Sequence, residues 1–235
     1  MNEAIDRFLP YERNLFLALN GSDCPFLDGV MWTLTGRFIW APLILFLIYM
    51  IFYKISWKEG ALVLLFLVLV VTLCDQVASS VFKPMFHRFR PTHHPDFAAF
   101  VDIVKGYKGG RYGFISSHAA NSFGLSVFLS LIFRQKQTAI LAFLVWAALN
   151  SYSRIYLGVH FISDVLAGMI VGTIIAFMLY ILYRFLRSKI FKIPQGEQNA
   201  SQPYTRRHAR IIAGVIGAYL LFVIALSPLL ANLPH

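Results

Sequence analysis

Long apolar segments alternate with short polar segments along the 235 residues of the chain. A helix that spans a membrane needs about 20 consecutive, mostly apolar residues, and several segments reach that length. The pattern therefore predicts an all-α protein, a six-span transmembrane helical bundle that forms one integral membrane domain over residues 1–235. The predicted spans cover residues 29–53, 60–82, 117–133, 138–157, 161–186 and 211–231.

The first 25 residues precede the predicted spans and mix charged with apolar side chains. The apolar residues recur at near-helical spacing, which predicts an N-terminal helix within residues 1–25. Two placements are open. The helix lies on the membrane surface as an amphipathic interfacial helix, or it packs on the spans as a short cap. The apolar positions are Ile5, Phe8, Leu9, Leu15, Phe16 and Leu19.

Composition agrees with a membrane protein, because 58% of the residues are hydrophobic and only 14% are charged, against about 25% charged residues in soluble domains. The net charge of +10 does not indicate a nucleic-acid partner, since the sequence contains no soluble basic domain. In membrane proteins, Lys and Arg gather in cytoplasmic loops and against anionic lipids. Cys24 and Cys74 show no metal-binding spacing, and we expect neither a metal nor another cofactor.

Basic residues between the predicted spans indicate the orientation in the membrane. Three alternate loops carry many of them, and the last of these includes a polar loop at residues 193–208, so the three loops are expected on the cytoplasmic side. The other ends of the spans then face the periplasm or exterior of a bacterial cytoplasmic (inner) membrane. The basic residues of these loops are Lys54, Lys58, Arg134, Lys136, Arg184, Arg187, Lys189, Lys192, Arg206, Arg207 and Arg210.

One loop on the outer side does not follow this charge rule. Residues 83–116 are also rich in Lys, Arg and His, and an anionic substrate would explain positive charge on that side. Two motifs flank this loop, KPMFHRFRP at residues 83–91 and FISSH at residues 114–118. A third motif, SRIYLGVHFISD at residues 153–164, joins the fourth and fifth predicted spans. Counting the spans places all three motifs on one side of the membrane, which predicts one shared site.

The cations in these motifs suit a phosphate group. Lys83 and Arg90 are seven residues apart, about two helical turns, so both can point to one side. The Arg guanidinium is a planar fork that matches phosphate oxygens, and Lys supplies a point charge. Arg154 adds a third cation. Ser116, together with the backbone amides near Ser117, lies at the predicted start of a helix, where anions bind well.

Two histidines and one aspartate supply the chemistry. His160 and Asp164 are spaced i, i+4, so Asp164 can fix the tautomer of His160 and leave its other ring nitrogen free to attack. His118 opens the third predicted span, where it can protonate a leaving oxygen and later deprotonate a water. Together these residues predict a mechanism with a phosphohistidine intermediate.

The three motifs resemble the signature of the type 2 phosphatidic acid phosphatase family, the lipid phosphate phosphatases. That signature is K-x6-R-P, then P-S-G-H, then S-R-x5-H-x3-D. The first and third elements are complete in this chain, whereas in the second Ile115 replaces the Pro and Ser117 replaces the Gly. The resemblance implies a membrane enzyme that needs no metal and usually acts at the outer face of the membrane.

The resemblance also implies roles for residues of this sequence. His160 is then the nucleophile, Asp164 orients it, and His118 is the general acid and later the base. His87 and Arg88 lie inside the first motif but match no fixed position, and we expect them to be solvated or to contact a headgroup. The phosphate is held by Lys83, Arg90, Ser116 and Arg154.

The expected function is hydrolysis of a lipid phosphate or diphosphate. Four substrates are consistent with the motifs: undecaprenyl diphosphate, lipid A phosphate, phosphatidylglycerophosphate and phosphatidic acid. Two alternatives stay open, a lipid phosphotransferase with the same histidine chemistry and a non-enzymatic membrane transporter or scaffold. A transporter is expected to line a path across the bilayer with charges, whereas the strong charges of the motifs gather at one interface and only Asp75 and Arg37 are drawn inward. The bilayer is an expected partner, and the sequence does not indicate an oligomeric state.

Overall fold

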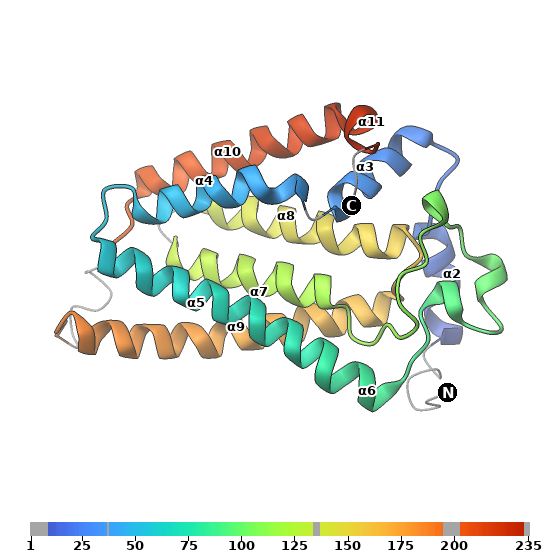
Figure 1. Ribbon diagram of the computed structural model, residues 1–235, viewed down its shortest axis with the longest axis horizontal. Coiled ribbons are helices and arrows are strands. Elements are labelled where there is room, and N and C mark those ends of the chain that lie inside the picture. Colours follow the sequence, from blue (N-terminus) through green and yellow to red (C-terminus); the bar gives the residue numbers. More distant parts are fainter. Residues whose placement is uncertain (1–8, 37, 134–136, 195–202, 233–235) are drawn as a thin grey trace.

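The chain folds into a bundle whose helices run side by side along the long axis of the molecule (Figure 1). The computed structural model describes residues 9–36, 38–133, 137–194 and 203–232. Within these ranges, β pairing is limited to one isolated bridge between Phe89 and Tyr112, and the prediction of an all-α fold is confirmed. The main helices are α4 (Ala41–Phe52), α5 (Trp57–Gln76), α7 (Ser117–Ile132), α8 (Gln137–Tyr156), α9 (Ile162–Ile190) and α10 (Arg206–Ala225).

Four helices of the described residues are long and apolar enough to cross a membrane: Trp57–Phe86, Gln137–Tyr156, Ile162–Ile190 and Arg206–Ala225. The first of them continues from α5 through the π-helix η2 (Val77–Phe82) into α6 (Lys83–Phe86). A pair of helices, Pro25–Thr35 and Phe38–Phe52, qualifies as a fifth segment only if its 73° bend is accepted within one span. Helix α7 has 16 residues, so the count of six spans stays a prediction.

The bend divides the predicted first span, residues 29–53, into two parts. Helix α3 (Pro25–Thr35) ends at Gly36, whose backbone is extended with φ −64° and ψ 143°. Glycine is a poor helix former because it loses much backbone entropy on ordering. The chain then resumes in η1 (Phe38–Trp40) and α4. Apolar periodicity alone did not reveal this break, because the longer segments on either side of Gly36 and Arg37 are both apolar.

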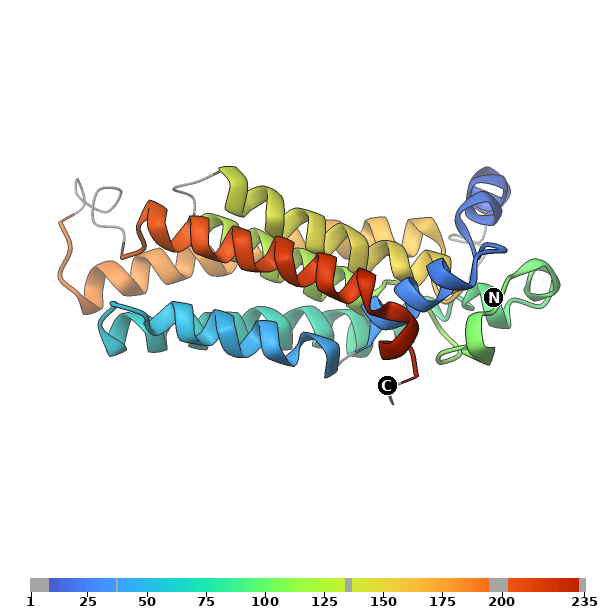
Figure 2. The ribbon, with the colours of Figure 1, turned by 90° about the horizontal axis from the view of Figure 1, so that it is seen from above.

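Helix α7 lies in the centre of the bundle and packs most extensively against α9 and α8 (Figure 2). Two glycines of α9 allow the α7 backbone to come close. A Cβ atom on Gly172 would lie 2.2 Å from the carbonyl oxygen of Ala120, and one on Gly168 would lie 2.6 Å from that of Ser116. Small residues permit such contacts between membrane helices. The start of α7 is thereby held against the first part of α9.

The N-terminal segment forms helix α2 (Leu9–Leu19), which packs on α8 and α9. Phe16 is fully buried, and its ring lies 5.5 Å from Phe97 and 5.4 Å from Phe161 between ring centroids. These contacts correspond to the cap alternative for this segment. The predicted helix does not continue to residue 25, because α2 ends at Leu19 and α3 begins only at Pro25.

The connections lie at the two ends of the bundle. Residues 87–116 form a long loop at the same end as α2 (Figure 1), with three short turns, η3 (Pro91–His93), η4 (Ala98–Phe100) and η5 (Val104–Gly106). The predicted polar loop at residues 193–208 falls partly on residues 195–202, which lie outside the described residues. Beyond them the buried Tyr204 hydroxyl donates to the Ile51 carbonyl at 3.0 Å. A short helix, α11 (Ser227–Leu230), follows α10.

Candidate active site

The three sequence motifs meet at one end of the bundle. The first motif occupies α6 and the residues after it, the second precedes α7, and the third joins α8 to α9. In Figure 1, α6, the start of α7, the end of α8 and the start of α9 all lie at the end that also holds α2. The structure therefore places the predicted site residues at one end of the molecule, as the span count implied.

His160 and Asp164 form the buried centre of this site. His160 is 1% exposed, Asp164 is 0% exposed, and 3.5 Å separate His160 Nδ1 from Asp164 Oδ2. The same carboxylate oxygen accepts a hydrogen bond of 3.0 Å from the backbone amide of Phe161. Helix α9 begins only at Ile162, so the turn before the helix, rather than one helical face, brings the imidazole to the carboxylate.

The three predicted cations have different environments. Lys83 Nζ donates to the Ser117 hydroxyl at 2.8 Å, which links α6 to the start of α7. Arg90 is 9% exposed, and its Nε donates to the Tyr112 carbonyl at 3.2 Å. Its Nη1 atom is buried and has no hydrogen-bond partner among the described residues. A buried donor without a partner is costly, and a phosphate oxygen would satisfy it.

Arg154 is held by two side chains from other parts of the chain. One terminal nitrogen, Nη1, donates to the Thr35 hydroxyl at the end of α3. The other, Nη2, donates to the Tyr107 hydroxyl at 3.3 Å. The guanidinium carbon lies 5.6 Å from the centre of the Tyr107 ring, within the range of a cation–π contact. The loop before α7 therefore helps to position this cation.

The electrostatics keep His160 neutral. Burial lowers the pKa of the His160 imidazole well below its ordinary value, because a charged ring loses its hydration. Three cations lower that pKa further, and a hydrogen bond with the Gly113 backbone only partly opposes them. Burial also lowers the pKa of Arg90 to about 10, and repulsion from Arg154 contributes. The cations acting on His160 are Arg90, Arg154 and Lys83.

The start of α7 supplies the second predicted motif. The backbone amide of Ser116 donates to the Asp164 carbonyl at 3.0 Å, which ties α7 to α9. The Ser116 hydroxyl caps the helix by accepting from the Ala119 amide at 3.4 Å. His118 lies in the first turn of α7 and lines a cavity of about 570 Å³ together with Thr35 and Asn150. The predicted roles of Ser116, Ser117 and His118 toward phosphate stay predictions.

One sequence expectation is wrong. Arg88 was expected to be solvated or to contact a headgroup, but it is 0% exposed. Its Nη1 donates to Asp164 Oδ1 at 2.7 Å, and its Nη2 donates to Glu12 Oε1 at 2.6 Å. Two carboxylates that satisfy the guanidinium explain why it is buried. The sequence could have indicated that Glu12 faces the protein, because this charged residue lies four residues from both Phe8 and Phe16 and so falls on the apolar side of the helix.

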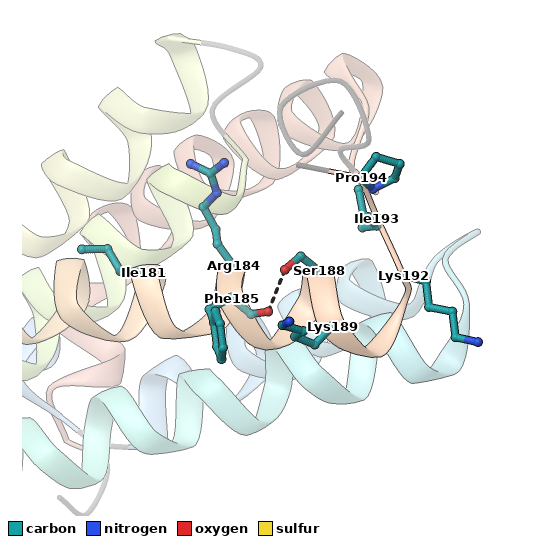
Figure 3. A pocket seen from close by; sticks show the side chains of 8 residues that line it. All are labelled: Ile181, Arg184, Phe185, Ser188, Lys189, Lys192, Ile193 and Pro194. Carbon is teal, nitrogen blue, oxygen red and sulfur yellow. Dashed lines mark hydrogen bonds between the residues drawn. The ribbon is translucent and has the colours of Figure 1, made fainter. Parts of the chain in front are cut away.

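A second cavity, of about 650 Å³, lies at the other end of α9 and is not a candidate for this chemistry. Its basic residues include Arg184, Lys189 and Lys192. Figure 3 shows Arg184 and Lys192 pointing in different directions rather than toward one ligand position. At a rise of 1.5 Å per residue, Arg184 lies about 30 Å along α9 from Asp164. Across the described ranges, no three His, Cys, Asp or Glu side chains gather as metal ligands would.

The sequence of this chain resembles those of known proteins. Residues 60–188 match the PAP2 superfamily. A lipid A 4'-phosphatase of Porphyromonas gingivalis is 44% identical over 187 residues, which cover 79% of this chain and 78% of that protein. A lipid A 4'-phosphatase of Bacteroides thetaiotaomicron is 37% identical over 180 residues, which cover 76% of this chain and 80% of that protein.

A solved structure shares the fold. It is the first transmembrane PAP2 type phosphatidylglycerolphosphate phosphatase from Bacillus subtilis, and it matches with a TM-score of 0.58. The match covers 81% of this chain and 89% of that chain at 22% sequence identity. The apolar helices, the family match and the phosphatase relatives together identify an integral membrane phosphatase. With the family match over residues 60–188 and relatives at 44% and 37% identity, the chain belongs to the PAP2 superfamily.

Proposed function

We propose that the protein hydrolyses a lipid phosphate or diphosphate through a phosphohistidine intermediate on His160. The observation that carries this proposal is a buried imidazole that lies 3.5 Å from the Asp164 carboxylate, with a pKa lowered by burial and by three cations. A neutral imidazole has a lone pair for attack on phosphorus, and nearby cations stabilise the negative charge of the phosphoryl oxygens.

In the first step, the ring nitrogen of His160 that does not face Asp164 attacks the phosphorus atom. An N–P bond forms as the bond between phosphorus and the leaving oxygen breaks, and His118 gives that oxygen a proton. The imidazole gains positive charge, which the Asp164 carboxylate stabilises. Lys83, Arg90 and Arg154 stay close to the phosphoryl oxygens throughout this step.

In the second step, His118 takes a proton from a water molecule, and the water oxygen attacks phosphorus. The N–P bond breaks, inorganic phosphate leaves, and His160 returns to its neutral form. With a monoester the other product is a lipid alcohol, and with a diphosphate it is a lipid monophosphate. A phosphotransferase would pass the same phosphoryl group to another acceptor, so a labelled substrate that yields inorganic phosphate distinguishes hydrolysis from transfer.

The direct test is His160→Ala in purified protein, with phosphate release measured in detergent. Removing a nucleophile is expected to lower kcat on the order of 10⁴-fold or more. His93→Ala, on the loop at residues 87–116 and outside the motifs, is the control and should keep its activity. Rapid quenching with a labelled substrate should place label on His160 in the unchanged protein. Full activity of His160→Ala would overturn the mechanism.

Lipid A phosphate is the first substrate to test among the four candidates. Its support comes from relatives called lipid A 4'-phosphatase at 44% and 37% identity. The long basic loop at residues 87–116 can accommodate a bulky anionic headgroup. The assay is a panel of lipid A, undecaprenyl diphosphate, phosphatidylglycerophosphate and phosphatidic acid, compared by kcat/KM. A preference of about tenfold or more for another lipid would reject this assignment.

The cavity beside His118 supports a substrate with a long acyl chain. Its lining is almost entirely apolar, and it meets the site at Thr35, which binds Arg154. Ile44 of α4 and Val68 of α5 also line it and are 51% and 56% exposed, so the cavity reaches the bundle surface between these helices. We assign this cavity to an acyl chain of the substrate, which would enter from the bilayer.

A pair of tryptophan variants on α5 tests the acyl-chain assignment. Leu67 lines the cavity, whereas Leu65 is 53% exposed and does not line it. Leu67→Trp should raise KM for a long-chain lipid phosphate about tenfold and leave hydrolysis of p-nitrophenyl phosphate unchanged. Leu65→Trp should change neither activity. Equal loss on both substrates in Leu67→Trp, or no loss on the lipid, would argue against the assignment.

The site is expected to face the periplasm or exterior of a bacterial cytoplasmic membrane. In support, the connection between α4 and α5, which contains Lys54 and Lys58, lies at the opposite end of the bundle, together with the end of α9 and the start of α10 (Figure 1). Cys24 is exposed at the end that holds the site, so a membrane-impermeant maleimide should label it in intact cells. In a Cys24→Ser background, Lys189→Cys should react only after the cells are lysed. The reverse pattern would invert the orientation.

A further inference from the structure

A buried charge network lies behind the carboxylate that orients His160. Arg88 donates to Asp164 Oδ1 at 2.7 Å and to the Ser163 hydroxyl at 2.6 Å, both through Nη1. Its guanidinium carbon lies 4.5 Å from the centre of the Phe161 ring. Asp164 therefore uses Oδ1 for Arg88 and keeps Oδ2 toward His160. Arg88 fixes which carboxylate oxygen faces the imidazole.

Glu12 completes the network from helix α2. Its Oε1 accepts from Arg88 Nη2 at 2.6 Å and from the Ser163 hydroxyl at 2.8 Å. Its Oε2 accepts from the Ser163 backbone amide at 2.8 Å, in the first turn of α9. Free amides at a helix start favour a negatively charged acceptor. Glu12 thus binds both the arginine and the start of the helix that carries Asp164.

The charges of the network matter for the chemistry at His160. Arg88 forms ion pairs with two carboxylates, Glu12 and Asp164, so the three groups carry one net negative charge. If Glu12 were neutral, Arg88 would offset the charge of Asp164 alone. Asp164 would then stabilise less well the positive charge that His160 gains when its N–P bond forms. Glu12 therefore keeps the net charge of the network negative and, through Arg88, helps to fix the orientation of the Asp164 carboxylate.

Helix α2 is anchored independently of Glu12. Phe16 is fully buried against Phe97 and Phe161. After the helix, the Asn20 side-chain amide donates to the Tyr156 carbonyl at 2.8 Å, and its oxygen accepts from the Asp102 backbone amide at 2.8 Å. A neutral residue in place of Glu12 therefore leaves α2 attached by contacts that do not involve charge.

We infer that Glu12 and Arg88 are positioning residues for the phosphoryl transfer, and that α2 is part of the catalytic apparatus through them. They act on His160 only by way of Asp164. This inference rests on the proposed function, since it concerns the same nucleophile. It assigns a role in catalysis to an N-terminal helix that lies outside the three motifs and outside the family match at residues 60–188.

The test is a double-mutant cycle between Glu12→Gln and Asp164→Asn in the full-length protein. Glu12→Gln is expected to lower kcat about tenfold and to change KM by less than about twofold, because it weakens transition-state stabilisation rather than substrate binding. In the Asp164→Asn background, the same change should alter kcat by less than about twofold. A residue with only a structural role would lower activity equally in both backgrounds.

Arg13→Gln is the matched control, because Arg13 is the next residue on α2 and its guanidinium contacts the Phe100 ring rather than the network. Its kcat should stay within about twofold of the unchanged protein. If Glu12→Gln does not fold, Ser163→Ala removes a hydroxyl that both Arg88 and Glu12 bind and enters the same cycle. Unchanged kcat in a folded Glu12→Gln protein, or equal losses in both backgrounds, would overturn the inference. His160→Ala separately tests the proposed function, so the two failures are distinguishable.

Discussion

Two buried arginine–carboxylate networks lie at opposite ends of α9, and they differ in how completely the carboxylates are used. At the end away from the site, Arg187 and Glu59 form a closed pair. Arg187 Nε lies 3.1 and 2.9 Å from the two carboxylate oxygens, and Nη2 lies 2.7 Å from Oε1. The pair joins α5 to α9, and each oxygen of Glu59 is bound by the same arginine.

At the site end, one arginine serves two carboxylates. Arg88 binds Oδ1 of Asp164 and Oε1 of Glu12, while Oδ2 of Asp164 stays directed at His160. The comparison teaches that burial and ion pairing alone do not identify a functional carboxylate. Asp164, the carboxylate that we propose orients His160, keeps an oxygen that its arginine does not bind. Four predictions test this difference, from the largest expected effect to the smallest.

Of the four predictions, the substitution Asp164→Asn in the network at the site end should have the largest effect on kcat. The amide cannot stabilise a positive imidazole and can favour the wrong tautomer, so kcat should fall about 10³- to 10⁴-fold. The measurement is kcat for phosphate release from a lipid substrate. Glu59→Gln, its counterpart in the closed pair, should keep kcat within about twofold. Similar losses of kcat in both variants would remove the distinction between the two networks.

Replacing each arginine by methionine should separate stability from catalysis. Either change leaves a buried carboxylate without its cation and should lower the free energy of unfolding by about 3–5 kcal/mol. Arg88→Met should also lower kcat about 10- to 100-fold, because Asp164 loses its fixed orientation. Arg187→Met should leave the kcat of the folded protein unchanged. Thermal unfolding in detergent and kcat per folded molecule are the two measurements.

The pH dependence of kcat/KM should report the cations around His160. Because the pKa of His160 is lowered below its ordinary value of 6.5, the neutral nucleophile should persist as the pH falls through 6.5. The acid limb of kcat/KM should therefore lie below that pH. Arg90→Gln removes a charge that lowers this pKa and should move the acid limb to higher pH. Arg111→Gln, on the same loop, is the control, and an equal shift in both variants would contradict the assignment.

The smallest effects are expected from two helix caps with the same contact distance. The Ser116 hydroxyl at the site end and the Ser56 hydroxyl at the other end each accept a backbone hydrogen bond of 3.4 Å. Replacing either serine by alanine should cost about 1 kcal/mol of stability. Only Ser116→Ala should also raise KM, because Ser116 is proposed to hold phosphate. An equal KM in the two variants would limit Ser116 to a cap.

Much of the helix framework could be predicted from local sequence. The predicted span at residues 138–157 corresponds to Gln137–Tyr156, and that at 161–186 corresponds to Ile162–Ile190. Long apolar segments determine such helices because lipid offers backbone groups no hydrogen-bond partners outside the helix. The three motifs could be assigned to one side of the membrane because an even number of predicted spans separates each motif from the others. The break at Gly36 was missed because hydrophobicity does not report backbone direction.

The sequence by itself determined the apolar helices and, through its three motifs, the phosphatase family. Tertiary structure alone decided which charges pair. Arg88 lies 76 residues from both Asp164 and Glu12 along the chain, so no periodicity relates them. Their contact depends on how α2 packs on the start of α9 and on how the loop after α6 turns into the bundle. Burial of a guanidinium is favourable only where packing brings carboxylates to it. Residues so far apart in the sequence come together only when the helices pack.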